Sequence, residues 1–134
     1  ITQAQILRLL HDLKKGLRRV SWILITHNMG AAAVVCDRIA VMYAGQLMEL
    51  ADVKSLFAHP LHPYTQALLR SIPKIHVFDQ HLDSIPGNPP DLGKPLAGCR
   101  FRSRCPYQQD TCTKGDIEAI EVSPGHLVRC SSCQ

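Results

Sequence analysis

The chain has 134 residues, of which 46% are hydrophobic and 19% charged, and its formal net charge is +4. This composition is typical of a globular protein, and the length is enough to bury a hydrophobic core. Because the basic residues are scattered, the charge is only a weak indication of a nucleic acid or anionic lipid partner. No run approaches the roughly 20 apolar residues that cross a bilayer, and no signal peptide is visible. We therefore expect any membrane contact to be made through a partner.

The N-terminal residues predict a helix followed by a short buried strand. From Thr2 to about Arg19, leucine and isoleucine recur at three- and four-residue spacing between charged residues, which indicates an amphipathic helix. Trp22–Ile25 is a continuous run rich in β-branched and aromatic residues, as in a strand covered on both faces. Since the chain starts with Ile1 and its first residues already read as helix, we expect it to begin within a larger protein.

A β-hairpin between short helices is predicted next. Its strands are Arg38–Tyr43 and Gln46–Leu50, joined by a tight turn at Ala44-Gly45. Helices are predicted from their N-caps or initial prolines at Ala31–Cys36 after Asn28, Val53–Ala58 after Asp52, and Tyr64–Ser71 after Pro63. The order helix, strand, helix, hairpin, helix, helix fits the distal part of an α/β domain.

The character of the sequence changes after Pro73. Residues 74–98 are rich in proline and glycine and show no helical or alternating period, which predicts an extended connector. Residues 99–134 contain five of the six cysteines. We therefore divide the chain into an α/β part at 1–73, a connector at 74–98 and a cysteine-rich extension at 99–134.

Four cysteines of the extension follow the pattern C-x5-C-x6-C-x17-C, at Cys99, Cys105, Cys112 and Cys130. Zinc ribbons bring in their ligands as two close cysteine pairs, and the first three cysteines are too widely spaced for that. Wide spacing suits a larger group whose ligands approach from several directions, such as a 4Fe-4S cluster bound by four cysteine thiolates. Cys133 forms a C-x2-C with Cys130 and competes with it for the fourth place. Zinc and unliganded thiols stay open as alternatives.

Several runs resemble the ATP-binding subunits of oligopeptide and dipeptide ABC importers. They are TQAQIL, ILITHNMG, CDRIAVMYAGQLMEL and, most specifically, HPLHPYTQAL from His59 to Leu68. The resemblance covers essentially the whole chain. It implies the distal part of a P-loop ABC-type nucleotide-binding domain, followed by a small irregular Cys-rich extension. The implied function of the complete protein is to couple ATP hydrolysis to the uptake of short peptides.

The same resemblance implies the partners of the complete protein. These are a second ATP-binding subunit, two membrane permease subunits and, indirectly, a peptide-binding protein, with no nucleic acid. The implied location is peripheral, at the cytoplasmic face of the cell membrane. The implied ligands are ATP and Mg²⁺ in the full-length protein and a 4Fe-4S cluster, or alternatively zinc, on Cys99, Cys105, Cys112 and Cys130.

His27 follows the predicted strand directly. Spacing alone favours a histidine that only ends the strand and binds a backbone carbonyl. The family resemblance places it at the switch-histidine position, where it would contact the γ-phosphate of ATP and help to position the attacking water. Such a role is physically reasonable, because phosphoryl transfer is catalysed mainly by positioning and charge stabilisation.

The sequence has no Walker A, signature or Walker B motif. The one Gly-Lys pair, Gly93-Lys94, is followed by Pro95 where a phosphate loop needs Ser or Thr, and Asn88 stands at the place of the first glycine. We therefore expect an ATPase only in the full-length protein. A noncatalytic metal-binding module with a regulatory or assembly role is the alternative function.

Two further sets of residues have two interpretations each. Arg100, Arg102 and Arg104 surround the proposed ligands and either offset their negative charge or face solvent. The apolar residues of Tyr64–Ser71 lie at helical spacing, which favours packing over a role as a mount for the cysteine segment or as a contact with a partner ATPase.

Overall fold

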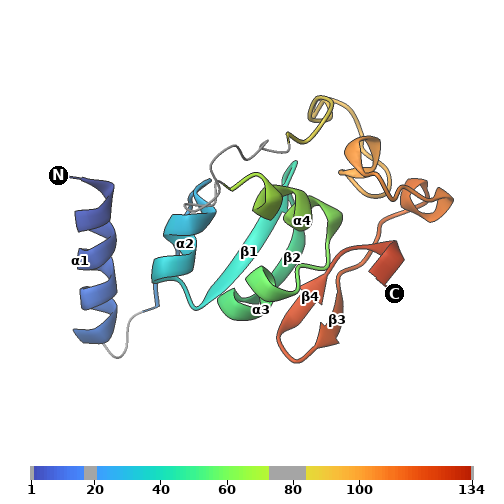
Figure 1. Cartoon of the computed structure of the whole chain (residues 1–134). Helices are drawn as coiled ribbons and strands as arrows, with labels where there is room; N and C mark the ends of the chain where they lie inside the picture. The colour runs from blue at the N-terminus through green and yellow to red at the C-terminus, as the bar shows by residue number, and fades with distance from the viewer. Residues whose placement is uncertain (1, 17–20, 73–83, 134) are drawn as a thin grey trace.

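The computed structural model describes residues 2–16, 21–72 and 84–133. Helix α1 (Gln3–Gly16) and the cysteine-rich segment lie at opposite ends of the molecule, with a sheet between them (Figure 1). α1 packs against α2 (Met29–Val35), and Lys14 Nζ joins them by contacts of 3.2 Å to the Val35 carbonyl and 2.5 Å to Asp37 Oδ1. Among the described residues, no helix combines the length and the apolar character required to span a bilayer.

The sheet has four strands in the order β1-β2-β4-β3. The predicted hairpin is confirmed by antiparallel β1 (Arg38–Tyr43) and β2 (Gln46–Asp52). Alternate residues of β1 are buried, as in a strand with one face on the core. Ala44 and Gly45 have φ angles of 50° and 76°, because a two-residue turn that matches the twist of its strands needs left-handed backbone at both positions.

The predicted strand at Trp22–Ile25 is wrong. Residues 21–26 have no regular secondary structure, and the side chains of Ile23 and Ile25 are 93% and 94% exposed. A buried strand needs hydrogen-bonded neighbours, and no strand in the described part of the chain pairs with this segment. The apolar run therefore showed that this segment has the composition of a strand. It could not show whether other strands lie beside the segment and pair with it.

The short helices begin where their caps predict. Asn28 Oδ1 accepts a hydrogen bond of 3.0 Å from the Ala31 N–H at the start of α2. Asp52 caps α3 (Val53–Ala58) in the same way. His62 caps α4 (Pro63–Arg70), whose proline occupies a first-turn position where no N–H is needed.

Two groups of buried side chains form the core, and Tyr64 packs against both. The first is Ala32, Ile39, Val41, Ala51 and Leu56, between α2, α3 and the hairpin. The second is Tyr43, Met48, Cys99, Phe101, Cys112 and Ile117, between the hairpin and the cysteine segment. The packing role predicted for the start of α4 is thus confirmed, and the helix also touches the cysteine segment.

The segment from residue 84 onward contains little regular secondary structure. Residues 84–98 contain no helix or strand, and the remainder forms three single-turn 3₁₀ helices and a small hairpin. This hairpin consists of β3 (Ile120–Ser123) and β4 (His126–Val128), and β4 pairs with β2. One sheet therefore contains strands from before and after the connector.

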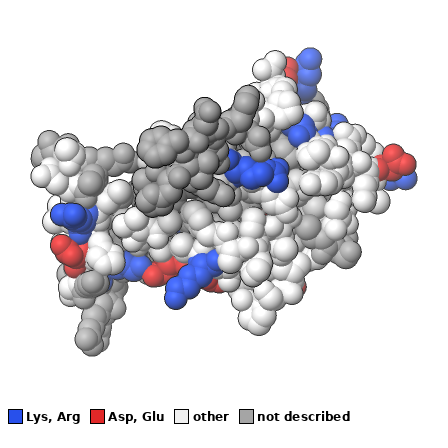
Figure 2. All heavy atoms as spheres, viewed as in Figure 1, with Lys and Arg blue, Asp and Glu red and all other residues white. Residues whose placement is uncertain are grey.

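The surface charges do not gather into one patch on the face shown in Figure 2. Lysine and arginine side chains are separated there by neutral surface and by acidic residues. This distribution agrees with the scattered basic residues of the sequence and gives no support to a nucleic acid interface on that face.

Candidate functional site

His27 lies in the bend just before α2. Its neighbour Asn28 caps that helix, and the Asn28 N–H also binds Thr26 Oγ1 at 3.0 Å, so two local hydrogen bonds shape the backbone around the histidine. The side chain is exposed. It lines a cavity of about 730 Å³ together with Trp22, Thr26 and residues of β1 and α4. The histidine is therefore accessible to a ligand, as a γ-phosphate contact requires.

The Gly93-Lys94 segment forms a turn. Asp91 Oδ1 accepts a hydrogen bond of 2.9 Å from the Gly93 N–H, and Lys94 Nζ lies 3.7 Å from Asp91 Oδ2. A phosphate loop needs a series of free N–H groups at a helix N-terminus, and no helix begins in the described residues 84–98. The segment therefore has the form of a turn closed by Asp91.

The four predicted ligand cysteines converge. Burial raises the pKa of the Cys99 thiol, and the neighbouring Cys112, Cys105 and Cys130 thiols raise it further. Burial likewise raises the pKa of Cys105, with further contributions from Cys130 and Cys112. Like charges must be close to have such an effect. The four thiols, none of which is in a disulfide, therefore lie within electrostatic range of one another.

This place is largely closed to solvent. Cys99, Cys112 and Cys130 are buried, and Cys105 is partly buried. Within the described part of the chain, no three His, Cys, Asp or Glu side chains are arranged to hold a single metal ion. The side chain of Cys133 lies outside the described residues. The described side chains therefore do not form a preorganised site for one tetrahedral ion.

A close backbone contact joins two of the cysteine loops. The Cys99 N–H donates to the Cys112 carbonyl at 2.9 Å. Gly98 precedes this contact with φ at 70°, and a Cβ there would lie 2.2 Å from the Cys112 oxygen. Only glycine fits such an approach, because any side chain would collide with the carbonyl.

The three arginines beside the cysteines bind backbone carbonyls. Arg100 donates to Ala44 and Arg102 to Ala97. Arg104 donates to the Ile85 and Pro86 carbonyls at 2.7 and 2.8 Å. These contacts attach the cysteine segment to the hairpin turn and the connector. The arginines thus have a third role that neither sequence interpretation included.

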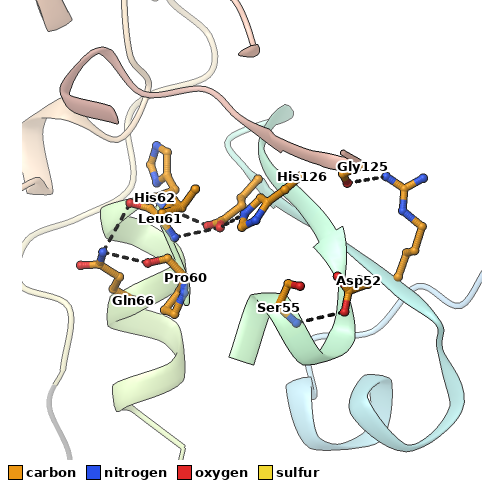
Figure 3. Close-up of polar contacts among 10 residues, drawn as sticks. Asp52, Ser55, Pro60, Leu61, His62, Gln66, Gly125 and His126 are labelled. Carbon is orange, nitrogen blue, oxygen red and sulfur yellow. Dashed lines mark hydrogen bonds and ion pairs between the residues drawn. The ribbon is translucent and has the colours of Figure 1, made fainter. Parts of the chain in front are cut away.

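A buried network beneath the cysteine segment was not anticipated from the sequence. Glu49 on β2 is fully buried, and its Oε1 lies 2.7 Å from His126 Nε2 on β4 (Figure 3). The same carboxylate accepts the Leu61 N–H at 2.8 Å and the His62 N–H at 2.9 Å. One carboxylate thus connects β2, β4 and the loop that leads into α4. The available signal in the sequence was an acidic residue between the apolar Met48 and Leu50.

His62 is held in one ring orientation. Its Nδ1 accepts the Tyr64 N–H at 3.0 Å, so the neutral ring carries its proton on Nε2. Burial lowers the pKa of His62 to about 4, against smaller opposing effects of Glu49 and the Arg129 backbone. The ring also lies 6.0 Å from that of Phe101, which belongs to the same core group as Cys99. His62 is therefore a neutral, buried part of the contact between the two halves of the chain.

The comparisons with known proteins give a clear similarity. A family model described as the C-terminal region of oligopeptide/dipeptide transporters matches residues 48–112. A probable peptide ABC transporter ATP-binding protein of Sinorhizobium fredii is 45% identical over 96% of the chain. By this match and this identity, the chain is similar to members of the oligopeptide/dipeptide transporter family.

Other relatives in this family carry related names. The dipeptide transport ATP-binding protein DppD of Bacillus subtilis is 43% identical over 97% of the chain. The oligopeptide transport ATP-binding protein OppD of Salmonella typhimurium is 40% identical over 96%. The chain spans 38%, 36% and 38% of the lengths of these three relatives. The region matched by the family model includes Glu49, His62 and the first three cysteines of the site.

Proposed function

We propose that the chain is the C-terminal part of an ATP-binding subunit that couples ATP hydrolysis to peptide uptake. The observation that supports this most strongly is the similarity over nearly the whole chain to dipeptide and oligopeptide transport ATP-binding proteins. The proposed partners are a second ATP-binding subunit, two membrane permeases and a peptide-binding protein. The proposed location is the cytoplasmic face of the cell membrane. ATP and Mg²⁺ would bind to the full-length protein.

In this proposal His27 contacts the γ-phosphate of ATP. Its exposed ring at the edge of a cavity supports the role. A donor at this place would stabilise charge on the transferred phosphoryl group and orient the attacking water. The residues that bind the other phosphates and Mg²⁺ would come from outside the 134 residues, since the chain carries no phosphate loop.

The test is a His27→Ala substitution in the full-length protein. ATP turnover should fall by about 100-fold or more while ATP binding is retained, because the substitution removes a contact to the reacting phosphate. His59→Ala is the matched control, since His59 is also exposed but follows α3. Unchanged turnover in His27→Ala would contradict the assignment. A wild-type protein without ATPase activity would instead favour a noncatalytic regulatory module.

We further propose that Cys99, Cys105, Cys112 and Cys130 hold a 4Fe-4S cluster. Their residue type, their burial and their electrostatic effect on one another support this proposal, because 4Fe-4S clusters are held by four cysteine thiolates. When bound, the cluster would supply thiolate bonds that tie irregular loops together, and metal binding of this kind contributes to folding free energy. Zinc on the same thiols is the alternative, with Cys133 as a competitor for the fourth place.

A further inference from the structure

Cys130 is placed by a very short strand. It follows Arg129 directly after β4, which has three residues and pairs with β2 at Glu49 with Val128 and Leu50 with Leu127. The Arg129 N–H donates to the Met48 carbonyl at 2.8 Å and extends this contact by one residue. These ladder contacts with β2 are few, and β4 also pairs with the short strand β3, so the buried side chains of β4 help to determine its register.

The register of β4 decides which way Cys130 faces. His126, Val128 and Cys130 are buried, whereas Leu127 and Arg129 between them are partly exposed. In a strand, alternate side chains lie on the same face, and a slip by one residue moves each of them to the opposite face. A slipped β4 would therefore turn Cys130 away from the other three thiols.

The contact between His126 and Glu49 opposes such a slip. Its 2.7 Å distance joins two side chains that are 7% and 0% exposed. With its proton on Nε2, the histidine donates to the carboxylate. A slip would leave the carboxylate buried without this donor, which is costly in a low-dielectric interior.

Glu49 is itself immobilised. The backbone N–H groups of Leu61 and His62 bind its two oxygens, and both precede the proline that starts α4 (Figure 3). The same loop carries the buried His62 ring, whose Nε2 has no hydrogen-bond partner among the described residues. The loop before α4 thus fixes the carboxylate that in turn fixes β4.

We propose that Glu49 and His126 are positioning residues that set the register of β4 and so direct Cys130 toward Cys99, Cys105 and Cys112. The effect on a metal cluster rests on the proposed function, because it requires these thiols to bind a cluster. The effect on the position of the Cys130 thiol does not depend on that proposal. Partners of this kind that orient metal ligands change metal affinity by about 10- to 100-fold when they are removed.

The experiment compares three variants of the full-length protein that contains this chain. His126→Phe keeps a ring of similar size and removes the donor. His126→Gln keeps an N–H donor and should rescue the defect. His59→Phe is the matched control, since this histidine is exposed and lies outside the network.

The first measurement is the alkylation rate of each cysteine by iodoacetamide in metal-free, reduced protein, read by peptide mass spectrometry. Cys36, at the end of α2 and away from the network, is the internal reference. We expect the Cys130 rate relative to Cys36 to rise about tenfold in His126→Phe, with a near wild-type ratio in His126→Gln and His59→Phe. The second measurement uses anaerobic protein reconstituted with iron and sulfide. There, His126→Phe should lose iron in air about tenfold faster and show a changed midpoint potential.

Each outcome decides the inference. An unchanged Cys130 rate in His126→Phe would overturn it, as would His126→Gln behaving like His126→Phe. A parallel rise at Cys36 and Cys130 would also overturn it, because the network would then support the whole fold and not the cysteine site. If wild-type protein binds no iron while the alkylation results hold, the cluster proposal fails and the positioning role stands.

Discussion

Acidification from pH 7 to pH 4 should destabilise the chain through His62. This histidine is 1% exposed, and burial lowers its pKa from 6.5 to about 4, so the folded protein keeps the ring neutral while the unfolded chain protonates it. Stability from the neutral ring is complete above pH 6.5 and decreases as the pH falls toward 4. At 1.36 kcal/mol per pH unit, the loss by pH 4 is about 3 kcal/mol.

The assay is urea unfolding of wild type and His62→Gln between pH 7 and pH 4. Glutamine retains an acceptor for the Tyr64 N–H that now binds His62 Nδ1, but it does not titrate. The unfolding free energy of wild type should fall by about 3 kcal/mol more than that of His62→Gln across this range. His59→Gln, at an exposed site, should keep the wild-type dependence. Equal pH dependence in wild type and His62→Gln would refute the assignment of a buried neutral ring.

Three substitutions test the packing and the backbone of the site. Phe101→Ala should lower the unfolding free energy by about 3–5 kcal/mol, because a ring 1% exposed leaves a cavity; a loss under 1 kcal/mol by urea titration would contradict the packing. Gly98→Ala should reduce the iron content of anaerobic protein, since the new Cβ collides with the Cys112 carbonyl; wild-type content would show that the loops do not need this approach. Asn28→Ala should cost about 1 kcal/mol by loss of the α2 cap, and no change in thermal unfolding would argue against that cap.

The turns and helix starts of the fold were predictable because neighbouring residues in the sequence determine them. The β1–β2 turn and the caps at Asn28 and Asp52 follow from residue types within a few positions of each other. The strand predicted at Trp22–Ile25 had no such local basis. A strand depends on neighbours from elsewhere, and no described strand pairs with that segment.

The cysteine site was predictable in part. Spacing selected the four cysteines, and the structure brings their thiols into mutual electrostatic range. The Glu49–His126 contact joins residues 77 positions apart in the sequence, so no short motif could show it. The roles of Arg100 and Arg104 were missed for the same reason, because their carbonyl acceptors lie in the hairpin turn and the connector.

The most direct test of the account is the metal content of the full-length protein isolated without exposure to oxygen. We expect four iron and four sulfide per chain, with broad sulfur-to-iron charge-transfer absorption, and we expect Cys112→Ser to lose both. Cys36→Ser is the control and should retain them, because Cys36 lies in the α2 region of the other core group. Zinc alone, or no metal, in protein that was never exposed to oxygen would contradict the cluster proposal.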